Sequence, residues 1–509
     1  MTLTPRRVPL NFLAAPIGGE VRGDGETAVS DVVLDSRRVR PGALFCCVPG
    51  ARVDGHELAG AALQAGAAAL LVQRPLAHDA PQLLVGSVRA ALAPLADAFY
   101  ASPSRRMDLV GVTGTNGKTT TTFMLESVFR TAGLVPGVIG TVEVRIGSRR
   151  LPVAHTTPEA PDLQRLLAEM VAGGVQAAAM EVSSHGLALG RVDATRFRAA
   201  VFTNLTQDHL DFHRDLEDYF QAKRRLLTAE FTGLGVVNVD DPYGRRLAAE
   251  ARAGAGVEVV TTGTGPEADW RARDVRAALD GTAFRVQGPA GERELRLRLA
   301  GRFNVANALG ALAAAAAVGI DLDTAVAGLE ALSGVPGRFE RVDAGQAFTV
   351  LVDYAHTPDS LSSVLRAARA VTAGRLLVVF GCGGDRDRAK RPLMGEIAGK
   401  LADVAVVTSD NPRSEPPEAI VAQIVEGVRR SAGPDRYHVE VDRRAAIRAA
   451  LALARPGDAV IIAGKGHEQG QELAGGRRIP FDDRVVAAEE LSALALPPGR
   501  GRDRTGGAP

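Results

Sequence analysis

The chain has 509 residues, more than one hydrophobic core usually organises, so several domains of about 100 to 200 residues each are expected. Its 60 Lys and Arg residues against 59 Asp and Glu residues leave a net charge of +1, which argues against a nucleic-acid or membrane partner. No apolar run approaches the roughly 20 residues of a membrane span, and the first residues lack an apolar signal core, so we predict a cytosolic protein.

The first hundred residues indicate short strands and Ala-rich helices, for example in "ALFCCVPG" and "ELAGAALQAGAAALLV". The polar stretch "YASPSRRMD" predicts a boundary near residue 105, so residues 1–105 form the first predicted domain. Cys46, Cys47 and Cys382 have neither disulfide nor metal-ligand spacing, and we interpret them as small buried apolar residues.

A glycine-rich loop follows the next predicted strand, "MDLVGV", and precedes the helical pattern "KTTTTFMLESVFRTAG". Five residues separate Gly111 from Gly117, one more than a strict P-loop allows. With Gly114 between them, these glycines would let the backbone turn and aim N–H groups at phosphate. Lys118 would reach the terminal phosphates, and the hydroxyl of Thr119 or Thr120 would face magnesium.

Polar clusters end the next two predicted strands of an α/β sheet that we expect to be mostly parallel. "MEVSSHGL" brings Glu181, Ser183 and His185, and "FTNLTQDHLDFH" brings Asp208 and His209 together with Asn204 and Asp211. Oxygen and imidazole ligands of this kind suit Mg²⁺ that bridges nucleotide phosphates.

A second joint, "LSGVPGRFERV", predicts a boundary near residue 336 and a central domain of residues 106–336. Beyond it, three apolar strands each deliver polar residues at the carboxyl end, where open α/β sheets bind ligands. We expect residues 337–495 to form the C-terminal domain and residues 496–509 to be a disordered tail.

Lysine is rare in this Arg-rich chain, which has it at positions 118, 223, 390, 400 and 465. Arg replaces Lys readily on a solvated face, but it does not easily lose its proton or form a carbamate. A lysine kept against this bias is therefore a candidate for chemistry, although "YFQAKRRLL", which contains Lys223, by itself also fits a solvated helix face.

Motifs along nearly the whole chain resemble the Mur ligase family, whose members build the peptide stem of peptidoglycan. The matching stretches, in order, are "GVTGTNGKTT", "HTTPEAPDLQ", "MEVSSHGLALGRV", "FTNLTQDHLDFH", "YFQAKRRL", "GRFNVANALGA", "GRFERV", "DYAHTPDSL" and "DNPRSEPP". The resemblance implies three α/β domains: an N-terminal UDP-sugar-binding domain, a central P-loop-like, mostly parallel ATPase domain and a C-terminal Rossmann-like domain.

The resemblance also implies a reaction, in which ATP activates a carboxylate as an acyl phosphate and an amine then attacks it. Lys118, His209 and Lys223 would be catalytic, with Lys223 carbamylated by CO2, and Mg²⁺ would be held by Thr119, Glu181, His209 and the carbamate of Lys223. The implied ATP-binding residues are Gly114, Thr115, Asn116, Gly117, Lys118, Thr119, Thr120, Asn304, Arg338, Asp353 and His356.

The implied carboxylate substrate is UDP-N-acetylmuramoyl-L-alanyl-D-glutamate. Its matching positions are Ser36, His155, Thr156, Thr157, Ser183 and Arg191. Two positions depart from the family pattern, because His155 stands where relatives often have Asn and Leu189 where some have Gln.

The block "DNPR" resembles that of members that join meso-diaminopimelate. This amino acid has a second carboxylate that L-lysine lacks, and a planar guanidinium such as that of Arg413 can bind it through two parallel hydrogen bonds. Glu468 suits the distal ammonium. The implied pocket comprises Arg388, Asp410, Asn411, Pro412, Arg413, Gly464 and Glu468.

Alternatives remain at this point. The same ligase with L-lysine or L-ornithine is one, and a folylpolyglutamate synthase-like ligase is another, disfavoured by the N-terminal domain and "DNPR". A P-loop kinase or nucleotide-binding regulatory module is a third, disfavoured by the glycine spacing. The expected partners are small-molecule substrates, and without coiled-coil heptads we expect a monomer.

Overall fold

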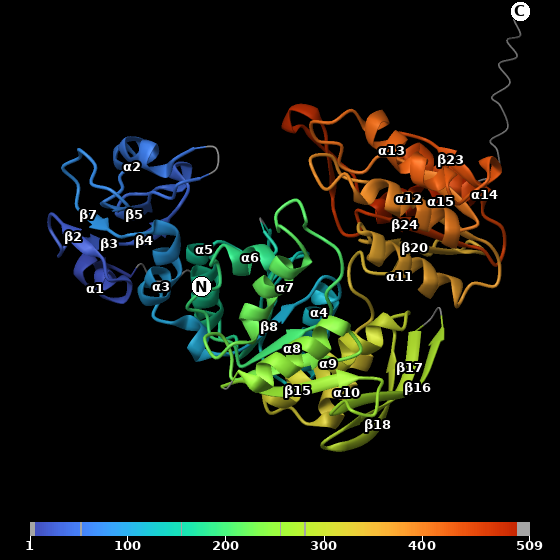
Figure 1. The fold of residues 1–509 in the computed structure, drawn as a ribbon, viewed down its shortest axis with the longest axis horizontal. Helices are drawn as coiled ribbons and strands as arrows, with labels where there is room; N and C mark the ends of the chain where they lie inside the picture. The colour runs from blue at the N-terminus through green and yellow to red at the C-terminus, as the bar shows by residue number, and fades with distance from the viewer. Residues whose placement is uncertain (1–5, 51–52, 154, 255, 279–280, 496–509) are drawn as a thin grey trace, which may run out of the picture.

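Three large β-sheets each organise one stretch of the chain in the computed structural model, and the central one lies between the other two (Figure 1). The structure describes residues 6–50, 53–153, 155–254, 256–278 and 281–495. The predicted tail, residues 496–509, lies outside the described residues. Among the described helices, none combines the length and apolar composition that crossing a membrane requires.

The N-terminal sheet has five strands in the order β2-β7-β6-β5-β4, parallel except for β2. Its buried strands carry apolar runs, and the three cysteines of the chain are unpaired and buried, as predicted. The elements are β1 (Val8–Pro9), α1 (Leu10–Ala14), β2 (Glu20–Arg22), β3 (Ala28–Val29), β4 (Asp31–Val33), β5 (Ala43–Cys46), α2 (Ala59–Gln64), β6 (Ala69–Val72), β7 (Gln82–Leu84) and α3 (Val88–Phe99).

The central sheet has eleven strands in the order β11-β10-β9-β12-β8-β13-β14-β15-β16-β17-β18. The strands from β9 to β16 are parallel, whereas β10, β11, β17 and β18 add antiparallel edges. The strands are β8 (Asp108–Thr113), β9 (Pro136–Ile139), β10 (Val144–Ile146), β11 (Arg149–Leu151), β12 (Ala177–Glu181), β13 (Ala199–Phe202), β14 (Leu234–Asn238), β15 (Glu258–Gly263), β16 (Trp270–Ala278), β17 (Gly281–Gly288) and β18 (Gly291–Leu297).

Helices cover this sheet, and the Ala-rich helix α9 is buried where it packs on α4. Small side chains let the two helices and the sheet approach closely, which fixes α4 behind the glycine-rich loop. The helices are α4 (Lys118–Thr131), α5 (Ala160–Ala172), α6 (Ser184–Ala188), α7 (Leu216–Arg224), α8 (Pro242–Ala253), α9 (Phe303–Ala317) and α10 (Leu322–Ala331).

The C-terminal sheet has six strands in the order β19-β20-β24-β21-β22-β23, with β19 antiparallel to the rest, and a small hairpin, β25–β26, lies apart from it. The fold class is the predicted α/β architecture. The elements are β19 (Glu340–Arg341), β20 (Thr349–Asp353), α11 (Pro358–Arg369), β21 (Leu376–Phe380), α12 (Lys390–Leu401), β22 (Val404–Val407), α13 (Pro417–Arg429), β23 (Tyr437–Val439), α14 (Arg443–Leu453), β24 (Ala459–Ala463), β25 (Gly470–Glu472), β26 (Arg478–Pro480) and α15 (Asp483–Ala495).

Candidate active site

The glycine-rich loop joins β8 to α4 at the carboxyl edge of the central sheet. Gly114 and Gly117 have φ angles of 145° and 90°, and a Cβ on Gly117 would lie 2.3 Å from Oδ1 of Asn307. Gly111 was expected to help this turn, but it lies within β8. A Cβ there would lie 2.8 Å from the Phe197 ring, so packing against that ring accounts for this glycine.

Two lysine side chains converge on one carbonyl of the loop. Lys118 Nζ donates to the carbonyl oxygens of Gly114 and Thr115, both at 2.9 Å, and Lys223 Nζ donates to the Gly114 carbonyl at 2.7 Å. Desolvation lowers the pKa of Lys118. Burial, together with the charge of Lys118, lowers the pKa of Lys223 well below its usual range. A larger fraction of Lys223 is therefore in the neutral amine form than for an exposed lysine.

The strand register brings the predicted polar cluster to the same edge. Glu181 lies opposite Val112 in the sheet, and its Oε1 and Oε2 accept hydrogen bonds from the backbone N–H and the hydroxyl of Thr141, at 2.8 and 2.9 Å. His209 has a left-handed backbone, with φ of 55°. Burial lowers the pKa of His209, although the charge of Asp208 opposes the shift. The imidazole is therefore neutral near pH 7 and able to bind a cation.

The C-terminal domain closes over the loop through hydrogen bonds. Arg338 Nη2 donates to the Thr119 hydroxyl at 2.8 Å, and Asn116 Nδ2 donates to Asp359 Oδ2 at 3.0 Å. Asp353 accepts from the backbone N–H groups of Phe339 and Ala355 at 2.7 and 2.8 Å. Burial raises the pKa of Asp353 to about 6 even though Arg338 opposes the shift.

A cavity of about 360 Å³ lies between these two domains. It brings together most of the residues predicted for ATP and metal. The predicted residues that line it are Thr115, Asn116, Gly117, Lys118, Thr119, Thr120, Thr156, Glu181, Ser183, His209, Lys223, Arg338, Asp353 and His356.

Asn304 does not line this cavity, although it was predicted to bind ATP. Its Nδ2 donates to the Ala300 carbonyl at 2.8 Å, and its Oδ1 accepts from Asn307 Nδ2 at 3.1 Å. Asn307 does line the cavity, and sequence reasoning missed it. The available signal was its position three residues after Asn304, which places both amides on one side of α9.

A second cavity, of about 220 Å³, adjoins the first, and Thr141, Thr156 and Tyr354 line both. Arg413 lies in its wall with a left-handed backbone, φ 51°. Its remaining lining residues are Val153, His155, Asn411, His467, Glu468, Gly470, Glu472 and Arg478.

Hydrogen bonds hold the predicted amino-acid residues of this cavity in place. Arg413 Nε donates to Glu472 Oε2 and its Nη1 to the Gly384 carbonyl, both at 2.8 Å. Asn411 donates to Glu468 Oε2 at 2.9 Å and accepts from Lys465 Nζ at 2.9 Å. The sequence pattern did not indicate Glu472, which positions the Arg413 guanidinium.

Four of the predicted amino-acid residues do not line this cavity: Arg388, Asp410, Pro412 and Gly464. The Arg388 side chain is 68% exposed and lies 3.3 Å from Glu415. Asp410 is buried, where burial would raise its pKa, but the charges of Lys465 and Arg443 outweigh burial and lower it. Gly464, with φ of 118°, makes room for Asp410, because a Cβ would lie 2.5 Å from its Oδ2.

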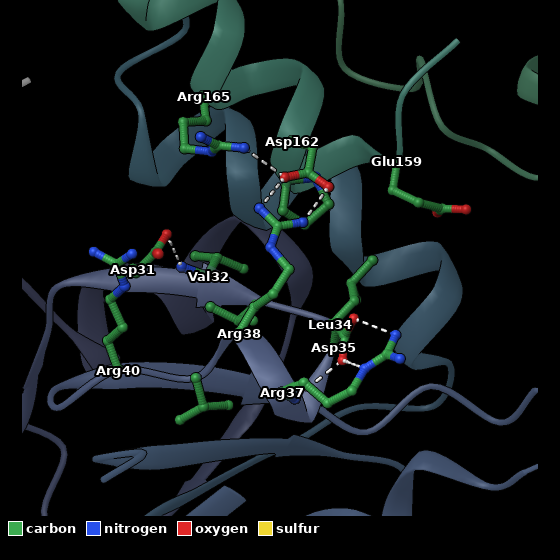
Figure 2. Close-up of a pocket in the computed structure, with 13 residues that line it drawn as sticks. Asp31, Val32, Leu34, Asp35, Arg37, Arg38, Arg40, Glu159, Asp162 and Arg165 are labelled. Atoms are coloured by element: carbon green, nitrogen blue, oxygen red, sulfur yellow. Dashed lines mark hydrogen bonds and ion pairs between the residues drawn. The ribbon is translucent and has the colours of Figure 1, made fainter. Parts of the chain in front are cut away.

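The N-terminal domain contributes a third cavity, of about 500 Å³, along β4 and the first turn of α5 (Figure 2). Ser36 begins the short 3-10 helix Ser36–Arg38, next to the lining residues Asp35 and Arg37. Arg38 crosses from the N-terminal domain to Asp162 of α5, where two hydrogen bonds of 3.0 and 3.2 Å form (Figure 2).

The predicted sugar-nucleotide residues of the central domain form their own network. Arg191 donates to the Thr157 carbonyl at 3.1 Å and pairs with Glu159 at 2.9 Å, and Glu159 also pairs with Arg89 of α3 at 2.6 Å. The buried Thr157 hydroxyl donates to the Glu181 carbonyl at 2.9 Å and accepts from the Ser183 N–H at 2.9 Å. The Thr157 hydroxyl is thus committed to the protein backbone.

Two adjoining cavities, one with the glycine-rich loop and two lysines and the other with Arg413 and Glu468, suit an ATP-dependent ligase, and comparison with known proteins shows that class. Residues 112–315 match the family described as "Mur ligase middle domain", residues 337–466 "Mur ligase, glutamate ligase domain" and residues 28–100 "Mur ligase family, catalytic domain". The chain belongs to the Mur ligase family.

Among its relatives is the UDP-N-acetylmuramoyl-L-alanyl-D-glutamate--2,6-diaminopimelate ligase of Streptomyces coelicolor, 50% identical over 95% of this chain and 97% of the relative. A solved structure of an enzyme of the same name has a TM-score of 0.69 and 34% identity, covering 97% of this chain and 100% of that one. A folylpolyglutamate synthase from Mycobacterium tuberculosis, at 20% identity and TM-score 0.62, covers 81% of this chain and 96% of its own and shares the fold.

Proposed function

We propose that this protein is an ATP-dependent amide ligase that adds meso-diaminopimelate to the D-Glu of UDP-N-acetylmuramoyl-L-alanyl-D-glutamate. The observation that carries the proposal is the pair of adjoining cavities, one with the phosphate loop and two lysines, the other with Arg413 and Glu468. A carboxylate activated in the first cavity would lie beside an amine held in the second, because the two cavities share Thr141, Thr156 and Tyr354. Likeness to the Streptomyces coelicolor ligase supports the choice of substrates.

The residues of the first cavity suit phosphoryl transfer, which depends on position and on neutralised charge. Lys118 and Arg338 supply two cations, and the N-terminus of α4 adds backbone N–H groups. As the carboxylate oxygen takes the γ-phosphoryl group from ATP, the bond between the γ-phosphorus and the bridging oxygen breaks, ADP leaves, and these groups stabilise the charge. The neutral amine then attacks the acyl phosphate, the C–N bond forms, the C–O bond to phosphate breaks, and the amine proton is released as phosphate leaves.

Mur ligases use ATP and Mg²⁺, and the residues of this cavity fit that ion. Mg²⁺ prefers oxygen ligands and combines one or two carboxylates with phosphate oxygens. Each Glu181 oxygen accepts one hydrogen bond from Thr141, which leaves lone pairs for a cation. Glu181, Thr119 and His209 would hold the ion, which would neutralise phosphate charge.

We assign a carbamate to Lys223, formed when its neutral amine adds to CO2 and a proton is released. The low pKa and burial of this lysine support the assignment. Its carbamate would add an anion beside the metal ligands. ¹³C NMR in ¹³C-bicarbonate should show a carbamate signal in the wild type that is lost in Lys223→Arg. Lys223→Ala should lose most turnover, with partial rescue by short carboxylates, and full activity of that variant would contradict the role.

The remaining predicted residues are assigned roles from where their side chains lie. Ser36, His155, Thr156, Ser183 and Arg191 would line the path of the sugar nucleotide. Thr157 would act indirectly, by holding the end of β12 in place, because its hydroxyl already bonds to backbone groups of Glu181 and Ser183. Arg388 would need to move to reach the amino acid, since it now faces solvent beside Glu415.

An amino-acid competition with the purified full chain tests the proposed function. Phosphate release should require ATP, the nucleotide dipeptide and meso-diaminopimelate together. L-lysine and L-ornithine serve as matched competitors, because they lack the distal carboxylate. Equal or faster turnover with either one would overturn the choice of amino acid and leave the ligase.

A further inference from the structure

The hairpin β25–β26 forms one wall of the amino-acid cavity and carries an arginine that sequence motifs did not single out. Arg478, the first residue of β26, lines the cavity together with Arg413. In the hairpin register it lies opposite Glu472. Its side chain lies flat against Gly470, where a Cβ would approach Arg478 Nε to 2.3 Å. Gly470 therefore makes room for this guanidinium at the cavity.

Both carboxylates of this wall pair with other cations, so Arg478 has no carboxylate partner among the described residues. Glu472 accepts from Arg413 at 2.8 Å, and Glu468 accepts from Lys465 at 2.8 Å. Burial lowers the pKa of His467 to about 4, so this histidine adds no charge at neutral pH. Within the part of the chain that the structure describes, no hydrogen bond or ion pair engages the guanidinium of Arg478. The cavity thus presents one uncompensated cation to its ligand.

An uncompensated cation selects between amino acids by the charge of their distal ends. The distal end of diaminopimelate has a carboxylate and an ammonium, whereas that of L-lysine has an ammonium alone. A guanidinium attracts the first through charge-assisted hydrogen bonds and repels the second. One residue therefore improves the affinity for the correct amino acid and penalises the wrong one.

We infer that Arg478 is a specificity-determining residue that binds the distal carboxylate of diaminopimelate beside Arg413. The inference rests on the proposed function, because it assumes diaminopimelate as the amino acid. In this inference two arginines share the binding of the distal carboxylate. Arg413 is fixed by Glu472 and the Gly384 carbonyl and offers the donors that remain, while Arg478 brings a guanidinium from the hairpin.

Steady-state kinetics of the full-length enzyme test the inference, with Arg478→Ala compared with Arg477→Ala. Arg477 is the matched control, since it is the neighbouring arginine, is exposed like Arg478, and does not line the cavity. Arg478→Ala should raise KM for meso-diaminopimelate about ten- to hundredfold, the range for a hydrogen bond to a charged group. KM for ATP and for the nucleotide dipeptide should stay within about twofold.

Selectivity gives a second readout that a merely structural role would not change. The ratio of kcat/KM for meso-diaminopimelate to that for L-lysine should fall in Arg478→Ala by the same factor or more. Arg478→Lys should recover part of the ratio, because it restores the charge without the planar pair of donors. Arg477→Ala should keep the wild-type ratio.

Three outcomes would overturn the inference. An unchanged KM for meso-diaminopimelate in Arg478→Ala, with a raised one in Arg413→Ala, would remove Arg478 and leave the proposed function standing. A similar rise in KM for all three substrates would assign the effect to the fold of the hairpin. A wild-type enzyme that does not accept meso-diaminopimelate would overturn the proposed function and the inference together.

Discussion

The central domain contacts the N-terminal domain at one joint and the C-terminal domain at another, and different interactions hold the two joints together. At the N-terminal joint, Arg38 pairs with Asp162 while its own side chain is 53% exposed, and Arg89 pairs with Glu159. At the C-terminal joint, Asn116 and Thr119 of the phosphate loop bond to Asp359 and Arg338. Partly exposed ion pairs hold the first joint, whereas hydrogen bonds from the glycine-rich loop and the start of α4 hold the second. We therefore expect closure of the C-terminal domain to be coupled to the predicted ATP site, and the N-terminal joint to be independent of it.

The largest expected difference between the joints comes from Arg338→Ala. This change removes a cation from the nucleotide cavity and the hydrogen bond to Thr119 together. We expect kcat/KM for ATP to fall about 100-fold, as for loss of one preorganised charge-stabilising donor. KM for the nucleotide dipeptide should change less than about threefold. Phosphate-release kinetics measure both quantities. A decrease in kcat/KM for ATP of less than about fivefold would contradict the coupling.

Acid should open the C-terminal joint and spare the N-terminal one. The pKa of His467 is about 4 in the closed structure and near 6.5 in its ordinary state, because of burial and of the charges of Arg338 and Arg484, opposed by Asp482. The folded protein thus favours neutral imidazole, and this contribution to its stability is complete above about pH 6.5 and is lost as the pH falls toward 4. For the joint the loss at pH 5 is at most about 2 kcal/mol, because His467 also packs against Tyr354 of its own domain and keeps that part of its burial when the joint opens.

Small-angle scattering at pH 7 and pH 5 checks this response. The radius of gyration of the wild type should increase at pH 5, and that of His467→Gln should not. At the other joint, burial would raise the pKa of Asp162, but its hydrogen bonds to Arg38 and Arg165 prevail and lower it. Those pairs should persist at pH 5. Equal expansion of the wild type and His467→Gln would assign the response to another group.

A matched pair of substitutions gives the smallest expected effect. Asp359→Ala removes the acceptor of Asn116 and Thr206 at the C-terminal joint, and Asp162→Ala removes the acceptor of Arg38 at the other. Asp359→Ala should lower kcat/KM for ATP about tenfold, the cost of hydrogen bonds lost at a partly buried carboxylate. Asp162→Ala should lower it less than about fivefold, because partly exposed ion pairs contribute about 1 kcal/mol or less. Equal losses would erase the difference between the joints.

Local patterns in the sequence predicted the strand ends well. Glu181 ends β12 and His209 follows β13, and both strands pair directly with β8 in parallel, which brings their carboxyl ends to one edge. The turn of the glycine-rich loop followed from Gly114 and Gly117, which both have positive φ angles. These features depend on a few neighbouring residues, so sequence alone specifies them.

Features that depend on distant packing were not predictable. Gly111 looks like a turn residue in sequence, but Phe197 determines its role. The antiparallel strands β17 and β18, which extend the central sheet, also lay beyond the predicted strands. Glu472 and Arg478 enter the amino-acid cavity through a hairpin whose position depends on packing against Arg413. Arg388 matches a family motif, yet the direction of its side chain leaves it beside Glu415.

The wall shared by the two cavities also bears on efficiency. Thr141, Thr156 and Tyr354 border both, so under the proposed function an acyl phosphate formed on one side would face the amine without first diffusing into solvent. Such mixed anhydrides hydrolyse readily, and each hydrolysis consumes an ATP without making an amide bond. The number of phosphates released per bond formed is therefore a direct measure of how tightly these three side chains exclude water.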